Sequence, residues 1–489
     1  MLNAFNSCSD RELVLLPPDG DLIEDITSQD KLQQILNNAY LSIGNSNALG
    51  SNILLYGDLL GDKIYNSPSR ALFQLTYNYS YNQYQNQFSF YRSMYETIMA
   101  CNMIINNTTV PHSNELTELK GQAHILRGIA YYYLVSYYSP TPASGVNQEY
   151  GVPLVLDSYD VTIQPARATV AQVYDQIIND LKYGITHTAL ATGGITTNKV
   201  LVGPDAARIV LARLYLTRRA AGDAELALQY ATQVTENAPD GEVAPTAGGS
   251  GAIKPGVQHT SADYTRYWTN NNDAIYEGHG ETIWELDLNN RNNAVMNIGS
   301  NGCLPVYYSP GDNTRRGILA NATFYNSFSG TSDIRRAAGN TGLFSTAALT
   351  PDTPAGYWIN KYPRLSSTGN FYRNIRIFRY SEAYLLRIEA LRLTGQTALA
   401  LTELNQFSWS RRGAVYTGTD LLNDILTEKS KEFFAEGQRF LDLKRYGLSV
   451  SRPSNCTTCE ISGTDHKMVL PIDQSAINSN PNLTQYPGY

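Results

Sequence analysis

The sequence predicts a mainly helical protein, in which tetratricopeptide-like helix pairs form a scaffold beside an irregular, loop-rich region with a few short strands. Apolar residues recur through much of the chain at the three-and-four spacing of amphipathic helices. The composition then changes at about 239–371 to Gly, Asn, Pro and Thr with scattered Trp and Tyr. The helical scaffold is therefore expected at about 28–235 and 375–446, with the loop-rich region between its two parts.

Single helices are predicted in the first part of the chain. The first follows Thr27 and Ser28, residue types that favour a helix N-cap. Its apolar positions are Leu32, Ile35, Leu36, Ala39, Tyr40 and Ile43. The second spans 84–99, with Tyr84, Phe88, Tyr91, Tyr95, Ile98 and Met99 at the same spacing. A third and a fourth helix are expected at 114–138 and 169–185.

Two further segments, 206–234 and 381–407, are predicted to be helix-turn-helix pairs. In each, a helix with small and apolar positions meets a Gly-centred turn and an Ala-rich return helix. Small residues let two helices approach closely, as in tetratricopeptide units with their period of about 34 residues. Because the spacing between the two pairs is irregular, we expect them within a larger fold and not in a regular solenoid.

The composition excludes several classes of protein. The 489 residues are 42% hydrophobic, which supports a sizeable core, and no apolar run approaches the ~18 residues of a membrane-spanning helix. A net charge of −7 argues against a nucleic-acid partner, because nucleic-acid binders cluster Lys and Arg. The 35 Tyr, against 13 Phe and 4 Trp, favour a binding surface, because tyrosine joins an apolar ring to a polar tip.

The segment 276–290 raises the question of a glycoside hydrolase. It offers four carboxylates near His279 from which such an enzyme could draw its pair: Glu277, Glu281, Glu285 and Asp287. However, Trp284, Leu286 and Leu288 alternate with Glu285 and Asp287 at period two, which favours a half-buried strand with its acids facing solvent. No Ser/His/Asp order, phosphate loop or HExxH motif stands out, so the sequence does not predict an enzyme.

Cys456 and Cys459 form a CxxC motif ahead of His466. A zinc site needs a fourth ligand, and no second CxxC or His pair supplies one. A local disulfide is therefore expected in an exported protein, and no metal site is predicted. No cofactor is predicted either, and the question of bound calcium stays open.

Charged residues gather near the C-terminus: Glu428, Glu432, Glu436, Arg439, Asp442 and Arg445. The three glutamates are four residues apart, on one face of a helix that Gly437 can end. Like charges at this spacing repel by a few tenths of a kcal/mol per pair, so compensation by the following arginines is expected. A structural network of paired charges competes here with a solvated charged face.

This segment resembles the C-terminal signature of the SusD/RagB family, surface lipoproteins that serve nutrient uptake in Bacteroidetes. The expected run E-x-x-x-E-x-x-x-E-G-x-R-x-x-D-L-x-R is filled, although Lys429 stands where Arg is common. Further segments follow the family's order: "LRGIAYYYLVSYY", "GVPLV", "VYDQIINDL", "GETIWELDL", "SDIRR", "FRYSEAYLLRIEA" and "LPIDQSAINSNPNLTQYPGY". The resemblance covers nearly all of 21–489 and implies a SusD-like domain there.

The resemblance also implies a location and a partner. The stretch "FNSC", ending at Cys8, loosely matches a lipoprotein cleavage site. The family then implies that Cys8 is acylated, that 1–20 form a tether, and that the body faces outward from the outer membrane. SusD-like proteins capture oligosaccharides without cleaving them and deliver them to a SusC-like TonB-dependent transporter.

The family provides no portable ligand motif, so the candidate ligand-binding residues rest on composition and position. They are Trp268, Tyr307, Tyr308 and Trp358 in the loop-rich region and Tyr81 and Tyr84 before the second helix. Ordinary packing is the alternative for each, and for Tyr84, in register with Phe88, it is the stronger one. Two other functions stay open: peptide capture by the same architecture, and a surface glycosidase that uses Glu281 or Glu285.

Overall fold

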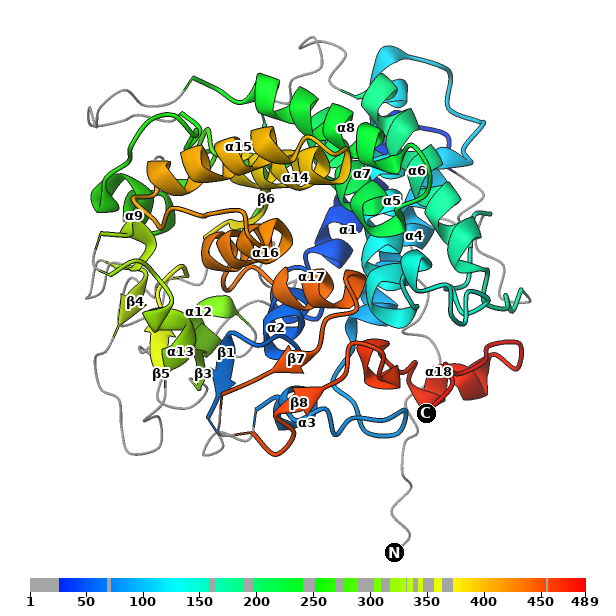
Figure 1. The fold of residues 1–489 in the computed structure, drawn as a ribbon. Coiled ribbons are helices and arrows are strands. Elements are labelled where there is room, and N and C mark those ends of the chain that lie inside the picture. The colour runs from blue at the N-terminus through cyan, green and yellow to red at the C-terminus, as the bar shows by residue number, and fades with distance from the viewer. Residues whose placement is uncertain are drawn as a thin grey trace, which may run out of the picture.

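The computed structural model describes most of the chain between residues 26 and 489. The described ranges are 26–67, 72–157, 163–188, 198–240, 251–269, 276–288, 303–308, 317–330, 332–336, 342–345, 356–362, 373–453 and 456–489. Helices dominate them, in agreement with the predicted class (Figure 1).

The first half of the chain folds into a row of helices. They are α1 (Gln29–Ile43), α2 (Asn52–Leu59), α3 (Gln74–Tyr77), α4 (Phe90–Ile105), α5 (Asn114–Tyr138), α6 (Val170–His187), α7 (Pro204–Arg218) and α8 (Asp223–Asn237). Neighbours in space follow the chain: α4 packs on α1 and α5, α5 on α6, α6 on α7, and α7 on α8. This order gives the curved helical wall visible in Figure 1.

Further helices lie in the C-terminal part of the chain. They are α14 (Tyr380–Leu393), α15 (Thr397–Ser410), α16 (Leu421–Glu432), α17 (Arg439–Arg445) and α18 (Gln474–Ser479). Helix α14 packs on α8, so the pairs α7/α8 and α14/α15 become neighbours although more than 140 residues separate them in sequence. Both predicted helix-turn-helix pairs are confirmed.

Local caps explain where several helices begin. Ser28 and Ser113 accept the backbone N–H groups of Lys31 and Leu116, at 3.3 and 3.0 Å. Thr169 begins α6 with a capping box. The helices predicted from 28, 114 and 169 are therefore confirmed, including their N-terminal ends.

The predicted helix at 84–99 is confirmed only from Phe90 onward. Ahead of it, the Oδ1 of Asn82 accepts the backbone N–H groups of Tyr84 and Gln85, at 2.8 and 3.0 Å. Such an Asx turn offers the backbone an alternative to helical hydrogen bonds. Tyr84 is consequently in a loop and out of register with Phe88, contrary to the prediction.

The central region, residues 239–371, contributes short helices and strands beside the helical wall. The helices are α9 (Ser261–Thr269), α12 (Leu304–Tyr308) and α13 (Ala322–Asn326), with a 3-10 turn, η5, at Ile334–Arg336. A four-stranded sheet has the order β1 (Ile64–Asn66), β3 (Ile318–Asn321), β5 (Gly356–Ile359), β4 (Phe344–Ser345), and all its pairs are antiparallel. Two further antiparallel sheets have two strands each: β2 (Thr282–Leu286) pairs with β6 (Ile375–Arg379), and β7 (Val450–Ser451) pairs with β8 (Glu460–Ile461).

The strand predicted around Trp284 is confirmed as β2, but the prediction that its acidic residues face solvent is wrong. All five residues of β2 are buried, because β6 lies along it and Trp284 meets Phe378 across the pair. Glu285 is thus enclosed with the apolar residues. One hydrophobic core extends from α1 through the helical wall into the central region.

The turn after α16 touches the backbone of α2. A Cβ on Gly57 would lie 1.9 Å from the carbonyl oxygen of Gly437, and Gly437 has φ +73°. A side chain at either position would force the two segments apart, and at Gly437 it would also be strained. The glycine of the charged C-terminal segment is therefore required by this close approach.

Candidate functional site

Buried ion pairs connect the charged segment after residue 420 to the central region. We call the following group the glutamate network: Glu428, Glu432, Glu436, Arg335, Lys361 and Arg379. Its side chains are at most 8% exposed. Arg335 donates to Glu428 at 2.6 Å, and Arg379 donates to Glu432 at 2.7 Å. Lys361 donates to Glu436 at 2.6 Å.

The charges in this network compensate one another. Burial on its own would raise the pKa of Glu432, but Arg411, Arg379 and Arg335 outweigh it and hold this pKa well below the usual range. Each carboxylate is enclosed by cations that are themselves buried. The network therefore cross-links α16, η5 and β6, and its acids are not accessible to a ligand.

Paired charges were expected here, but the predicted partners are wrong. Helix α16 ends at Glu432, so Glu436 lies in the following turn and not on the same helical face. The glutamates pair with cations of distant segments, whereas Arg439 donates to Asp62 at 2.7 and 2.8 Å. Arg445 donates to Asp442, at 2.6 Å, and to Glu389.

Five of the six predicted ligand-binding aromatics are buried: Tyr81, Trp268, Tyr307, Tyr308 and Trp358. The Nζ of Lys361 lies 4.5 Å from the ring centroid of Trp268. Tyr308 donates its hydroxyl to Asp58 at 2.7 Å, and Tyr307 packs edge-on against Phe73. A ring with no exposed face cannot lie against a sugar, so for these five residues the prediction is corrected to packing.

Tyr84 is the exception, with 72% of its surface exposed. The Asx turn at Asn82 fixes its backbone, and the backbone N–H of Gln474 donates to the carbonyl of Gln83 at 2.9 Å. The loop is thereby tied to the start of α18. Tyr84 is flanked in the sequence by residues with amide side chains: Asn82, Gln83, Gln85 and Asn86. This arrangement presents an aromatic face from a fixed, polar loop.

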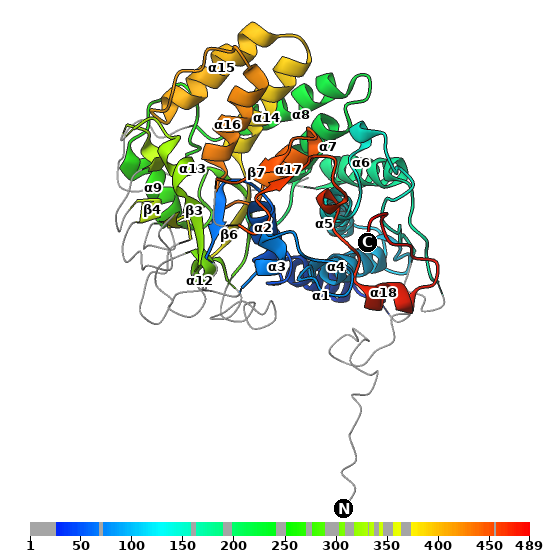
Figure 2. The ribbon, with the colours of Figure 1, turned by 60° about the horizontal axis from the view of Figure 1, so that its bottom comes forward.

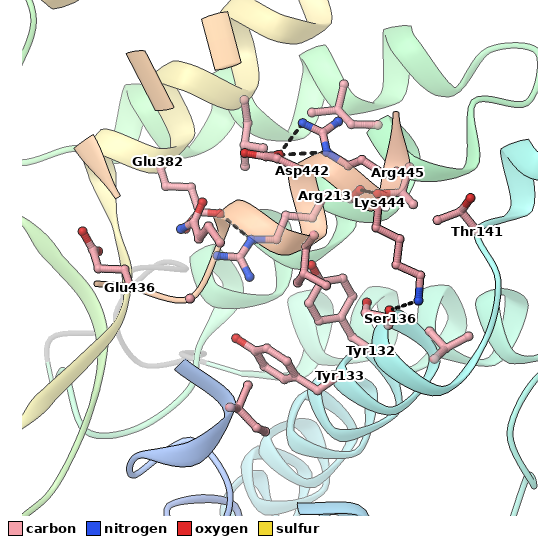
Figure 3. A pocket seen from close by; sticks show the side chains of 18 of the residues that line it. Tyr132, Tyr133, Ser136, Thr141, Arg213, Glu382, Glu436, Asp442, Lys444 and Arg445 are labelled. Atoms are coloured by element: carbon pink, nitrogen blue, oxygen red, sulfur yellow. Dashed lines mark hydrogen bonds and ion pairs between the residues drawn. The ribbon is translucent and has the colours of Figure 1, made fainter. Parts of the chain in front are cut away.

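A cavity lies between α5, α7 and the segment from Glu436 to Arg445 (Figure 3). Its volume is about 50 Å³, which is room for only a few water molecules at roughly 10–15 Å³ each. Arg213 bonds Glu382 inside it, and Lys444 donates to the carbonyls of Ser136 and Ser139 at 2.7 and 2.8 Å. Burial lowers the pKa of Lys444 to about 7. The cavity is too small for an oligosaccharide.

The carboxylates considered for hydrolysis have structural bonds. Glu281 accepts the backbone N–H groups of Ile253 and Ser381 at 2.8 and 2.9 Å. Glu285 accepts that of Gly278 at 2.8 Å. Both side chains are buried, at most 1% exposed, so no open cleft separates them for a sugar ring.

The disulfide predicted between Cys456 and Cys459 is confirmed. It links two residues three apart, directly ahead of β8. Across the described ranges, no group of three or more His, Cys, Asp and Glu side chains is arranged to hold a metal ion.

Membrane attachment is not visible in the described residues. Cys8 and the predicted tether at 1–20 lie outside them. Of the helices that are described, none has both the length and the apolar character needed to cross a bilayer.

Comparison with known protein families identifies the family of this chain. Residues 16–216 match a family model described as "Starch-binding associating with outer membrane", and residues 336–489 match the model of the SusD family. The chain belongs to the SusD/RagB family. A solved SusD superfamily protein from Bacteroides thetaiotaomicron superposes with a TM-score of 0.76, at 24% identity, over 94% of this chain and 99% of that one.

Other relatives agree with this assignment. A candidate sugar-binding protein from Bacteroides vulgatus has a TM-score of 0.79 at 26% identity, over 95% of this chain and 99% of that one. The starch-binding protein SusD of Bacteroides thetaiotaomicron is 33% identical over 122 residues, which are 24% of this chain and 22% of the relative. The matched stretches span about a quarter of the curated relatives' lengths.

The C-terminal signature of this SusD/RagB protein differs from the family's pattern at Lys429, and the substitution keeps the positive charge. Lys429 stands where Arg is common, and its Nζ lies 2.8 Å from Asp442. Asp442 also accepts from Arg445. The lysine therefore still provides a buried cation between α16 and α17.

One exposed aromatic was missed in the sequence. Trp409, near the end of α15, is 51% exposed, whereas the other three tryptophans are at most 1% exposed. The helical period contained the signal, because Ala400, Leu404 and Phe407 form the buried stripe of α15 and Trp409 lies outside it. The composition of the loop-rich region and of the Tyr/Asn/Gln stretch before the second helix predicted the candidate aromatics, and Trp409 lies outside both.

Proposed function

We propose that this SusD/RagB protein is a non-catalytic, cell-surface receptor for oligosaccharides, which it delivers to a SusC-like TonB-dependent transporter. We further propose that acylation of Cys8 anchors it to the outer membrane. Relatives described as starch-binding, sugar-binding or glycan-binding support the ligand class. The observation that carries the proposal is the Tyr84 loop, which holds an exposed ring among amide side chains.

The chemistry of this loop suits a sugar. An aromatic face can cover the C–H face of a pyranose, while Asn and Gln side chains exchange hydrogen bonds with its hydroxyls. The loop is already ordered by the bonds at Asn82 and Gln83, so little conformational freedom is lost on binding. Tyr84 therefore serves as the stacking residue of the proposed site.

The same features argue against hydrolysis. Cleavage would need two carboxylates that reach opposite sides of a glycosidic bond. Glu281 and Glu285 are enclosed and accept backbone N–H groups instead. The proposed receptor binds its ligand and releases it unchanged.

Calorimetric titration with neutral and charged oligosaccharides, with mixed peptides as the second panel, tests the ligand class. We expect saturable heat with one sugar class, an affinity about tenfold or more weaker in Tyr84→Ala, and an unchanged affinity in Tyr84→Phe, which keeps the ring. Heat with peptides alone would reject the sugar proposal and establish peptide capture. Release of shortened products from a bound sugar would reject the non-catalytic role.

The anchor and the partner are tested in the bacterium. Cys8→Ser should remove incorporation of labelled fatty acid and move the protein out of the outer-membrane fraction. The protein with Cys8 intact should co-purify with a TonB-dependent transporter. Unchanged fatty-acid labelling in Cys8→Ser would refute acylation at this residue, and purification without any such transporter would refute the partnership.

A further inference from the structure

We propose that the outer face of α15 carries a second glycan-binding site, in which Trp409 stacks against a neutral pyranose. This inference rests on the proposed function, because it takes oligosaccharides as the ligand class. It assigns a separate site, on a different element from the Tyr84 loop.

The exposure of Trp409 is the first observation. Helix α15 buries Ala400, Leu404 and Phe407 in a hydrophobic cluster with α14 and α16. Thr402, Gln406 and Trp409 emerge on the other side of the helix. Large apolar rings are normally enclosed, as the protein's other three tryptophans are, and an exposed indole between polar neighbours suits a partly apolar, partly hydroxylated ligand.

The second observation is an open hollow beside the ring. It is shallow and largely open to solvent, and it is lined by Gly256, Thr402, Asn405, Gln406 and Trp409. No lining residue is charged, so the hollow favours a neutral ligand over an anionic sugar or a charged peptide.

The walls of the hollow are held in place. The backbone N–H of His259 donates to the carbonyl of Ser410 at 3.0 Å, and the Nε of Arg412 donates to the carbonyl of His259 at 3.0 Å. Arg411 donates to the carbonyl of Ile253, also at 3.0 Å. The turn that contains Gly256 is thus fastened to the C-terminal end of α15. A preformed site loses little freedom when it binds.

The two amide side chains that line the hollow differ in their hydrogen bonds. The side chain of Asn405 bonds the backbone of Tyr416 in both directions, at 2.7 and 3.0 Å, and is therefore fixed. The Gln406 amide makes no hydrogen bond within the described part of the chain and is exposed. Gln406 is accordingly the group that would bond sugar hydroxyls beside the Trp409 platform.

The two sites lie at opposite ends of the molecule. Gln83, next to Tyr84, is bonded to the start of α18, and both views place α15 and α18 on opposite sides (Figures 1 and 2). One short oligosaccharide cannot occupy both sites. A long chain, or several chains of one polysaccharide, can use them together, and such double attachment strengthens binding beyond either site alone.

Tryptophan fluorescence tests the proposal on the full chain, because Trp409 is the one exposed tryptophan of four. A neutral oligosaccharide that binds in the calorimetric panel should shift the emission to shorter wavelength and protect it from iodide quenching. Trp409→Ala should abolish this response, and Leu399→Ala, an exposed control on the same helix, should keep it. Trp409→Ala should also lower affinity for the parent polysaccharide about tenfold or more.

The outcomes separate this inference from the proposed function. Sugar binding that leaves the emission of Trp409 unchanged and is lost in Tyr84→Ala would overturn the second site and keep the receptor. Protection of Trp409 by the co-purified transporter, and by no sugar, would also overturn it and identify α15 as a protein interface. Absence of binding by any oligosaccharide would reject both proposals.

Discussion

The central region and helix α15 place their aromatic residues in opposite environments. Trp268, Tyr308 and Trp358 of the central region are buried, although loop-rich composition favoured them as ligand contacts. Trp409 of α15 is half exposed, although it belongs to a regular helix. The central region has no long amphipathic helix, so large aromatic rings fill its core. In a regular helix, the spacing of the apolar residues indicates which face is buried. The exposure of an aromatic side chain therefore depends more on its position within a helix or strand than on the amino-acid composition of the surrounding region.

The tryptophans give the sharpest test of this contrast. Trp268→Ala should lower the free energy of unfolding by about 3–5 kcal/mol, because it empties a fully buried site. Trp409→Ala should change that free energy by no more than about 0.5 kcal/mol, because it removes a surface side chain. Guanidinium unfolding of both variants measures the difference. Equal losses in the two variants would show that the contrast in burial has no energetic counterpart.

Charged residues allow the same comparison. Glu432→Ala should lower the free energy of unfolding by about 3–5 kcal/mol, because it removes the carboxylate that buried Arg379 and Arg335 share and leaves the network with an uncompensated positive charge. Glu403 on α15 pairs with Arg387 near the surface, so Glu403→Ala should cost less than about 1 kcal/mol. Thermal and chemical unfolding compare the two. A small effect at Glu432 would contradict a structural role for the glutamate network.

The Asp62–Arg439 pair predicts a pH effect of intermediate size. Burial on its own would raise the pKa of Asp62, but Arg439 and Lys63 outweigh it and lower this pKa to about 2. An aspartate of the unfolded chain titrates near pH ~3.9. The stabilisation is therefore complete above about pH 4 and is lost as the pH falls toward 2, by roughly 2 kcal/mol.

Unfolding in urea across this pH window measures the loss. Asp62→Asn should flatten the pH dependence between about pH 4 and 2, because the titrating group is gone. Asp240→Asn, at a fully exposed aspartate, is the control and should leave the profile unchanged. A profile that stays as steep in Asp62→Asn would assign the acid sensitivity to other carboxylates.

Local patterns predicted much of the helical fold. The helices from Ser28, Ser113 and Thr169 and the two helix pairs follow from caps and apolar periods, which act between residues close in sequence. The partners of Glu428 and Glu436 did not follow, because Arg335 and Lys361 lie about 90 and 75 residues away. Such contacts depend on how elements pack, which no local pattern contains.

The candidate site was less predictable than the fold. The apolar spacing predicts a helix at Tyr84, whereas the side chain of Asn82 forms an Asx turn there. Trp409 was missed even though its helix was correctly predicted. For Tyr84 the decisive information was the Asx turn at Asn82, and for Trp409 it was which side of its helix is covered.

The central claim is that exposed rings, and not the buried rings of the central region, bind the ligand. Calorimetric titration of Trp268→Phe and Tyr84→Ala with the oligosaccharide that binds the unmodified protein tests it most directly. We predict that Trp268→Phe, which keeps an apolar ring in the core, retains the affinity, and that Tyr84→Ala loses about tenfold or more. Loss of binding in a folded Trp268→Phe, with full affinity in Tyr84→Ala, would contradict this account.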